Sequence, residues 1–288
     1  MKHVLKIAAV NLLLALPAFT APKDPPCVEE VDALAATIAR NTQNSERVAV
    51  IDHARLAIDT GVPMPPSILS IFSNPEVNTQ LVAAHPLLGL DLPLKVLAYA
   101  EPGAAQATVA YADAEFLMRR HGMTDSSLFQ PYEKTLMSTL AGIPKEIRIP
   151  VNTEGVEEGF GIIQMTSAHT LPETIIRLKN AILGQGDTVW FGQVDFQKDA
   201  VSQGVQIPGS TLLLFGGPKP GGLAMAEFPK LGLDAFCQKL LVYEAPGGSV
   251  KIAFNDIVKL AELHYGESNK PQQVINTRLS ATCENAIK

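Results

Sequence analysis

The sequence repeats itself at an offset of 143 residues, and this duplication constrains the fold more than any other feature. Five matched pairs in the same order are Asp52 and Asp195, Gly61 and Gly204, Pro65 and Pro208, Ser67 and Ser210, and Phe72 and Phe215. After one inserted residue the match resumes, so that Lys95 and Tyr99 correspond to Lys239 and Tyr243. Matches at a constant spacing predict two copies of one module rather than one large domain.

The composition is typical of a packed globular protein and argues against two classes of partner. The 288 residues are enough for two domains of ordinary size, and 47% of them are hydrophobic while 18% are charged. The formal net charge is -6. Binding to nucleic acid or to an anionic membrane depends on a basic surface, so neither partner is expected.

The first residues have the pattern of a secretory signal peptide. Lys2 and Lys6 make the start basic, residues 7–16 form a short apolar run, and residues 17–21 supply small side chains for cleavage. The run is shorter than the roughly 20 residues that a membrane span needs, and no later segment is apolar enough. The pattern predicts removal of residues 1–21 and a periplasmic or secreted protein. A buried first strand and an uncleaved anchor are the alternatives.

The remaining chain divides into a first repeat at residues 22–143, a linker at 144–154 and a second repeat at 155–288. In each repeat, short strand patterns alternate with turns and brief helices, and turns such as Glu101-Pro102-Gly103 are typical of hairpins. Parallel sheets need long crossover helices, which are few here. The sequence therefore predicts an α+β fold in which each repeat forms a small antiparallel sheet packed with helices.

One strand pattern of the second repeat, residues 159–167, has its counterpart in the first repeat at residues 16–24. That counterpart overlaps the predicted cleavage site, so export would leave the first sheet with an open edge. Because uncovered edge strands promote aggregation, another segment is expected to cover this edge. Residues 147–151, in the linker, are the candidate.

The three cysteines, Cys27, Cys237 and Cys283, allow one disulfide and one free thiol in an oxidising compartment. The sequence does not select the pair. No Cys-x-x-Cys motif is present, so structural cysteines are favoured over redox catalysis or zinc binding.

Several motifs, in a fixed order, resemble the family called domain of unknown function 302. In the first repeat they are Asp52-His53, Phe72-Ser73-Asn74-Pro75, Leu90-Asp91-Leu92-Pro93-Leu94-Lys95 and His121-Gly122. The second repeat is looser, with Phe196 in place of the first histidine and Gly217 in place of the asparagine. The resemblance implies an α+β fold of the TATA-binding-protein-like type and pairing of two such domains about a two-fold axis. It implies no activity, because the family name states that the function of the domain is unknown.

Two aspartates, Asp52 and Asp195, follow predicted strands at matching positions. A carboxylate there is expected to cap the following short helix by accepting backbone N–H groups. The alternative role is a general base or a ligand anchor, for which only Asp52 has a histidine neighbour, His53. Because the second repeat has Phe196 and Gly217 at the matching positions, a site that needs His53 or Asn74 can exist only in the first repeat.

Two histidines, His121 and His264, each lie eight residues after an aspartate that is predicted to cap a helix, Asp113 or Asp256. The helix dipole favours histidine at a helix C-terminus, which is a sufficient structural reason. Imidazole is also a common ligand of transition metals and titrates near neutral pH. No spacing such as His-x-x-x-His indicates a preformed metal site, and none is predicted.

Two lysines, Lys95 and Lys239, begin a predicted strand in each repeat. Surface lysines of an edge strand are expected there, or ion pairs with Asp52 or Asp195 across the sheet. The sequence contains no Gly-x-Ser-x-Gly, His-Glu-x-x-His or Gly-x-Gly-x-x-Gly motif, so the usual hydrolase, metalloprotease and dinucleotide-binding classes have no support.

Three functions follow as hypotheses. The leading one is a non-catalytic exported protein whose repeats form an intramolecular pseudo-dimer and bind a small, largely apolar ligand or cofactor of unknown identity. The first alternative is an enzyme or a metal or haem site built from Asp52, His53 and His121, which must then approach within about 5 Å in a cleft. The second is a structural or protein-interaction module. The candidate ligand-binding residues are Asp52, His53, Asn74, Lys95, His121, Asp195, Lys239 and His264.

Overall fold

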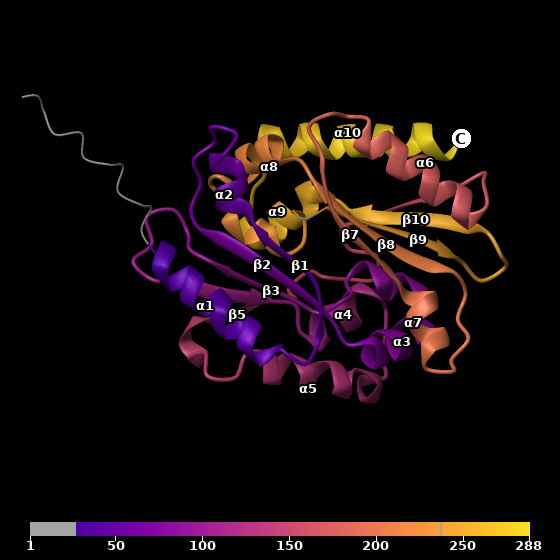
Figure 1. The fold of residues 1–288 in the computed structure, drawn as a ribbon, viewed down its shortest axis with the longest axis horizontal. Coiled ribbons are helices and arrows are strands. Elements are labelled where there is room, and N and C mark those ends of the chain that lie inside the picture. The colour runs from indigo at the N-terminus through magenta and orange to yellow at the C-terminus, as the bar shows by residue number, and fades with distance from the viewer. Residues whose placement is uncertain (1–26, 237) are drawn as a thin grey trace, which may run out of the picture.

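The computed structural model describes residues 27–236 and 238–288 as two five-stranded sheets with helices (Figure 1). The predicted signal peptide, its cleavage site and the counterpart strand at residues 16–24 lie outside the described residues. None of the described helices combines the length and the apolar character that crossing a membrane requires. The α+β fold with two repeats is confirmed.

The first repeat builds a sheet in the order β1-β2-β3-β4-β5. Its strands are β1 (Glu46–Asp52), β2 (Ser67–Ser73), β3 (Lys95–Tyr99), β4 (Thr108–Tyr111) and β5 (Arg148–Pro150). Its helices are α1 (Val28–Asn41), α2 (His53–Ile58), α3 (Pro75–Ala84), α4 (Ala114–Arg120) and α5 (Gln130–Thr139), with the 3-10 helices η1 (Pro86–Leu90), η2 (Ser126–Phe129) and η3 (Lys145–Ile147).

The second repeat builds a sheet in the order β6-β10-β9-β8-β7. Its strands are β6 (Ile162–Thr166), β7 (Val189–Asp195), β8 (Ser210–Gly216), β9 (Gln238–Glu244) and β10 (Val250–Asn255). Its helices are α6 (Leu171–Leu183), α7 (Phe196–Ser202), α8 (Pro218–Met225), α9 (Ile257–Tyr265) and α10 (Lys270–Ile287), with the 3-10 helix η4 (Pro229–Leu233).

A linker strand covers the open edge of the first sheet, as predicted. β5 pairs with β4 in parallel, with Val109 opposite Arg148, whereas β6 pairs with β10 antiparallel. The linker therefore supplies the fifth strand of the first sheet, where the second repeat uses a strand of its own. The repeats reach the same five-strand order by different connections, and all other neighbouring strands in both sheets are antiparallel.

Local signals account for most element boundaries. Aspartates at 52, 113, 195 and 256 accept hydrogen bonds from backbone N–H groups at the starts of α2, α4, α7 and α9, as predicted. Gly266, with φ 77°, ends α9 in the left-handed conformation that glycine adopts without strain. All seven residues of β2 and all seven of β8 are buried, including the three serines of β2.

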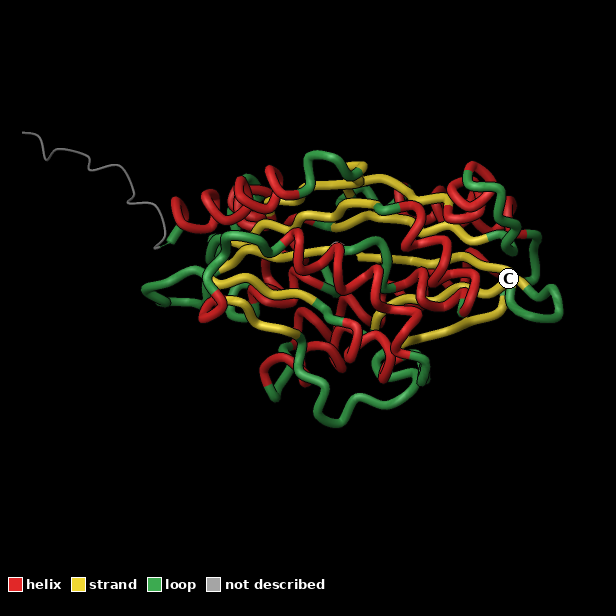
Figure 2. Tube along the Cα trace, turned by 90° about the horizontal axis from the view of Figure 1, so that it is seen from below, coloured by secondary structure: helices red, strands yellow, loops and turns green. Residues whose placement is uncertain are grey.

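The two repeats pack directly on each other. Helix α2 contacts α8 and α3 contacts α7, while η1 lies against β9 and η4 against β3. One apolar cluster contains buried side chains of both repeats, among them Leu88, Leu90, Leu214 and Leu241. Helices α1 and α5 lie on the far side of the first repeat, and α6 and α10 on the far side of the second (Figure 1). In the perpendicular view the strands of both sheets run roughly along the long axis of the molecule (Figure 2).

Two cysteines can be placed. Cys27 is half-buried and Cys283 is buried in α10, and these two cysteines form no disulfide with each other. Pairing through Cys237 falls outside the described residues. Burial raises the pKa of the Cys283 thiol to about 12, so this cysteine behaves as a small apolar side chain.

Candidate functional site

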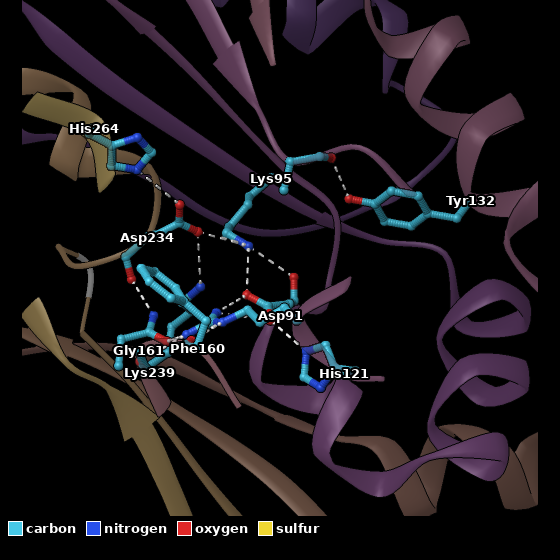
Figure 3. Close-up of polar contacts among 12 residues, drawn as sticks. Asp91, Lys95, His121, Tyr132, Phe160, Gly161, Asp234, Lys239 and His264 are labelled. Carbon is cyan, nitrogen blue, oxygen red and sulfur yellow. Dashed lines mark hydrogen bonds and ion pairs between the residues drawn. The ribbon is translucent and has the colours of Figure 1, made fainter. Parts of the chain in front are cut away.

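Seven ionisable side chains converge where η1 and η4 meet the central strands of the two sheets, and we call them the buried charge cluster (Figure 3). Its members are Asp91, Lys95, Arg120, His121, Asp234, Lys239 and His264. All seven side chains are at most 3% exposed. Ionisable groups are seldom buried so completely unless they are paired, which makes this cluster the candidate functional site.

Asp91 organises the half of the cluster in the first repeat. Arg120 Nη1 donates to both carboxylate oxygens, at 2.8 and 3.0 Å, and His121 Nε2 lies 2.7 Å from Oδ2. Lys95 Nζ donates to the Asp91 carbonyl oxygen at 2.9 Å. Burial alone would raise the pKa of Asp91, but Arg120, His121 and Lys95 outweigh it and hold that pKa well below its usual value. The carboxylate therefore stays charged.

Arg120 also ties the first repeat to the second. Its Nη2 donates to Asn255 Oδ1 at 2.8 Å and to the Gly161 carbonyl at 3.0 Å, and its Nε donates to the Phe160 carbonyl at 3.0 Å. A guanidinium can make this planar set of bonds because its donors are fixed in a fork. Arg120 is the last residue of α4, so its position depends on the helix that Asp113 starts.

Asp234 occupies the matching place in the second repeat but is held more loosely. Lys95 Nζ, reaching across from the first repeat, is 3.4 Å from Oδ1, Lys239 Nζ is 3.7 Å from the same atom, and His264 Nε2 is 3.6 Å from Oδ2. Neither carboxylate oxygen accepts a hydrogen bond from a residue that the structure describes. The residue that matches Arg120 is Leu263, so the second repeat has no guanidinium to supply one.

Protonation differs between the groups for physical reasons. Burial opposes ionisation of Asp234, but the charges of Lys95 and Lys239 and the contact with His264 still lower its pKa. Burial and the neighbouring charge of Lys95 lower the pKa of Lys239 to about 7. Burial also lowers the pKa of His121 and His264, although each faces a carboxylate. The histidines are therefore neutral at pH 7, and Lys239 titrates near that pH.

Of the eight candidate residues, four enter this cluster: Lys95, His121, Lys239 and His264. The expectation of surface lysines on edge strands was wrong. Lys95 begins β3, which pairs with strands on both sides, and it is 2% exposed; Lys239 in β9 is equally central. The lysines pair with Asp91 and Asp234 rather than with Asp52 or Asp195.

The other four candidates lie elsewhere. Asp52 and Asp195 cap α2 and α7, where each accepts a backbone N–H at 2.9 Å, and Asn74 caps α3. Asp52 also pairs with the exposed Arg55, while Asp195 lines a polar groove of about 400 Å³ between β1 and β7. Capping accounts for all three positions.

His53 packs across the boundary between the repeats. A Cβ atom added to Gly232 would lie 2.8 Å from His53 Cδ2, so the imidazole lies directly on the glycine backbone. Its counterpart Phe196 lies in the same way on Gly89, where an added Cβ would be 3.1 Å from the Phe196 ring. Burial lowers the pKa of His53 to about 4, so the ring is neutral.

His53 and Leu56 also line an apolar hollow between α2 and α8. The other side chains that shape it are Phe191, Met225 and Phe236, and Gly221 and Gly222 form part of its wall. Its volume is about 20 Å³, room for about one water molecule.

The sequence reasoning missed Asp91, Asp234 and Arg120 as site residues. A signal for the two aspartates was present, since Gly89-Leu90-Asp91 and Gly232-Leu233-Asp234 match between the repeats. No comparable signal marks Arg120, whose counterpart is a leucine. Across residues 27–236 and 238–288, no three histidine, cysteine, aspartate or glutamate side chains are arranged to hold a metal ion. The buried cluster brings carboxylates and cations together away from solvent.

Comparison with known proteins gives partial similarities. Two curated relatives, both named fluoride-specific ion channel FluC 1, come from Brucella suis and Brucella abortus; each is 32% identical over 105 residues, which is 35% of this chain. The chain spans 41% and 38% of their lengths. A crystal structure of an uncharacterized DUF302 protein from Bacillus stearothermophilus shares 20% identity with a TM-score of 0.38, over 44% of this chain and 98% of that one.

The match to a family profile is much broader. The profile described as domain of unknown function DUF302 matches twice, at residues 27–143 and at residues 163–286. These two ranges cover most of the chain and one repeat each. The chain therefore belongs to the DUF302 family and carries two tandem copies of its domain.

Proposed function

We propose that this chain is an exported, non-catalytic module in which the two repeats form an intramolecular pseudo-dimer that binds a small, largely apolar ligand between them. The observation that carries the proposal is the reciprocal contact between repeats. His53 lies on Gly232 and its counterpart Phe196 lies on Gly89. In a two-fold interface, if one residue contacts a second, the matching pair makes the equivalent contact.

A second pair of contacts has the same reciprocity. Helix α2 packs on α8, where a Cβ added to Gly222 would lie 2.6 Å from Ala57 Cβ. The matching helices α7 and α3 also pack, and Gln203 Nε2 donates to Thr79 Oγ1 at 3.0 Å. Thr79 is the counterpart of Gly222. Matched elements thus meet on both sides of the interface, which supports a pseudo-dimer.

The accessibility of the ionisable groups supports a non-catalytic role. The two Asp–His pairs of the buried charge cluster have side chains with no exposed surface, so a substrate has no contact with them. A general base has to reach the proton that it removes, directly or through one water. The proposed triad of Asp52, His53 and His121 gains no support either, because these residues contact Arg55, Gly232 and Asp91 respectively.

We assign the proposed ligand to the hollow between α2 and α8. Binding sites concentrate at boundaries between domains and are mostly apolar with few polar groups. Here the polar group is the neutral His53 imidazole, and the walls are aromatic or aliphatic. A ligand larger than a water has to displace Leu56 or Met225, and methionine adapts readily because its side chain is unbranched.

Native mass spectrometry and absorption spectroscopy of the chain produced in its own host test this proposal. We expect a bound mass or an absorption band that Leu56→Phe, which fills the hollow, removes. Ile58→Phe is the matched control, because Ile58 is on the same helix and is 47% exposed. Protein that is always empty, or a ligand that Leu56→Phe retains in full, would contradict the proposed site.

A further inference from the structure

The buried charge cluster contains one more cation than carboxylates. Its cations are Lys95, Arg120 and Lys239, and its carboxylates are Asp91 and Asp234. The two histidines are neutral at pH 7 because burial lowers their pKa. Since an uncompensated charge away from water is unfavourable, the cluster is balanced when one of its cations gives up a proton.

Lys239 is the cation that the structure stabilises least. Within the described part of the chain its Nζ makes no hydrogen bond, and the nearest carboxylate oxygen, 3.7 Å away on Asp234, lies closer to Lys95. Lys95 also donates a hydrogen bond to the Asp91 carbonyl. Arg120 donates hydrogen bonds to the Asp91 carboxylate and to Asn255. The proton is therefore most readily lost from Lys239.

The incomplete hydrogen bonding is concentrated in the half of the cluster that lacks an arginine. Five polar atoms there have no hydrogen-bond partner among the described residues: Asp234 Oδ1 and Oδ2, Lys239 Nζ, and His264 Nδ1 and Nε2. In the other half only His121 Nδ1 has none. Leu263 in place of a second Arg120 explains the difference, because a leucine donates no hydrogen bond to the aspartate.

We propose that Asp234, Lys239 and His264 form a buried proton-binding site whose occupancy follows the surrounding pH, and that binding the proton weakens the packing between the two repeats. The proton adds to the neutral Lys239 amine and gives an ammonium ion; no other bond forms or breaks. This site is independent of any ligand in the hollow between α2 and α8.

The place of Lys239 connects its charge to the interface. Lys239 lies in β9, and β9 packs against η1 of the first repeat. The charged groups that act on Lys239 come from both repeats: Lys95 of β3, Asp91 after η1, Arg120 at the end of α4 and Asp234 after η4. His264 of α9 and Lys230 of η4 act on Asp234 in turn, and His121 contacts Asp91. When Lys239 is protonated, the cluster between the repeats has a net positive charge. Repulsion of Lys239 by Lys95 and Arg120 then opposes the packing of the two repeats on each other.

Side-chain NMR of the intact chain, with lysines labelled at Nζ and Cε, measures this protonation directly. Lys239→Met identifies the resonance, and Lys251→Met in the neighbouring strand β10 is the matched control. We expect a midpoint near pH 7 for Lys239, and we expect Lys251→Met to leave that midpoint unchanged. A Lys239 midpoint above about pH 9 would overturn the proposal, whether or not the variants fold.

Hydrogen exchange of the same chain tests the effect on the interface. After correction for intrinsic rates, we expect the amides of η1 and β9 to open about tenfold more often at pH 6 than at pH 8, and we expect this difference to vanish in Lys239→Met. The Lys251→Met control should retain it. A pH response that Lys239→Met keeps would assign the effect to another group and refute the switch.

Discussion

Replacement of Asp91 by asparagine tests whether the buried charge cluster stabilises the fold. Asparagine keeps the shape and one acceptor oxygen but removes the charge that Arg120 and His121 face at 2.7–3.0 Å. Because the Arg120 side chain has no exposed surface, its guanidinium would be left buried without an anion. Removing one partner of a buried ion pair costs about 3–5 kcal/mol of unfolding free energy.

The same change in Asp234 is the matched control. No described residue donates a hydrogen bond to the Asp234 carboxylate, and the nearest cation, Lys95 Nζ, is 3.4 Å away, whereas Asp91 accepts from Arg120 at 2.8 and 3.0 Å. Asp234→Asn should therefore cost less than half as much as Asp91→Asn. At roughly 2–4 °C per kcal/mol, Asp91→Asn should lower the melting temperature by about 10 °C.

Urea unfolding followed by the fluorescence of Trp190, the single tryptophan, and by circular dichroism measures both variants. Coincident transitions justify two-state free energies. The pKa of Asp91 is lowered in the folded chain, so its stabilisation is complete above the unfolded pKa of about 3.9 and is lost as the pH falls below it. The difference between wild type and Asp91→Asn should accordingly shrink below about pH 4. Equal losses for the two variants, or a loss that does not depend on pH, would refute the reasoning.

Two further predictions concern packing and burial. Gly222→Ala should lower the free energy of unfolding by about 1–3 kcal/mol, because the new Cβ would lie 2.6 Å from that of Ala57. Adding Ala57→Gly to the same chain should restore most of this loss. A Gly222→Ala variant that is as stable as wild type in urea would contradict the close approach of α2 and α8. Cys283 should react with a thiol alkylator at neutral pH only when the chain unfolds, because it is buried and its pKa is about 12. Half-buried Cys27 should react in the native state. Peptide mass spectrometry measures both rates, and equal rates would show that α10 opens readily.

Much of the local structure could be predicted from the sequence. The duplication, the helix caps at Asp52, Asp113, Asp195 and Asp256, and the cover supplied by residues 147–151 all appear in the structure. These features depend on interactions within a few residues, or on a sheet edge that has to be covered.

The candidate site could be predicted only in part. His121 and His264 were singled out by their positions at helix ends, and Lys95 and Lys239 by their repetition. Their common partners were missed because Asp91 and Asp234 follow short apolar turns, where an exposed aspartate is ordinary. The placement of Lys95 on a surface edge was wrong because a strand's neighbours on both sides are set by the order of the whole sheet.

The sequence alone determined that this chain is two copies of one α+β module, because repetition, capping and apolar patterning are encoded locally. Only the tertiary structure decided that Lys95 lies between Asp91 and Asp234 and that Lys239 shares Asp234 with it. It also decided that Leu263, at the position that matches Arg120 in the duplication, donates no hydrogen bond to the Asp234 carboxylate, which has no hydrogen-bond partner among the described residues. The charge state of a buried group depends on desolvation and on neighbours that distant elements bring to it, and the packing of the two repeats fixes both.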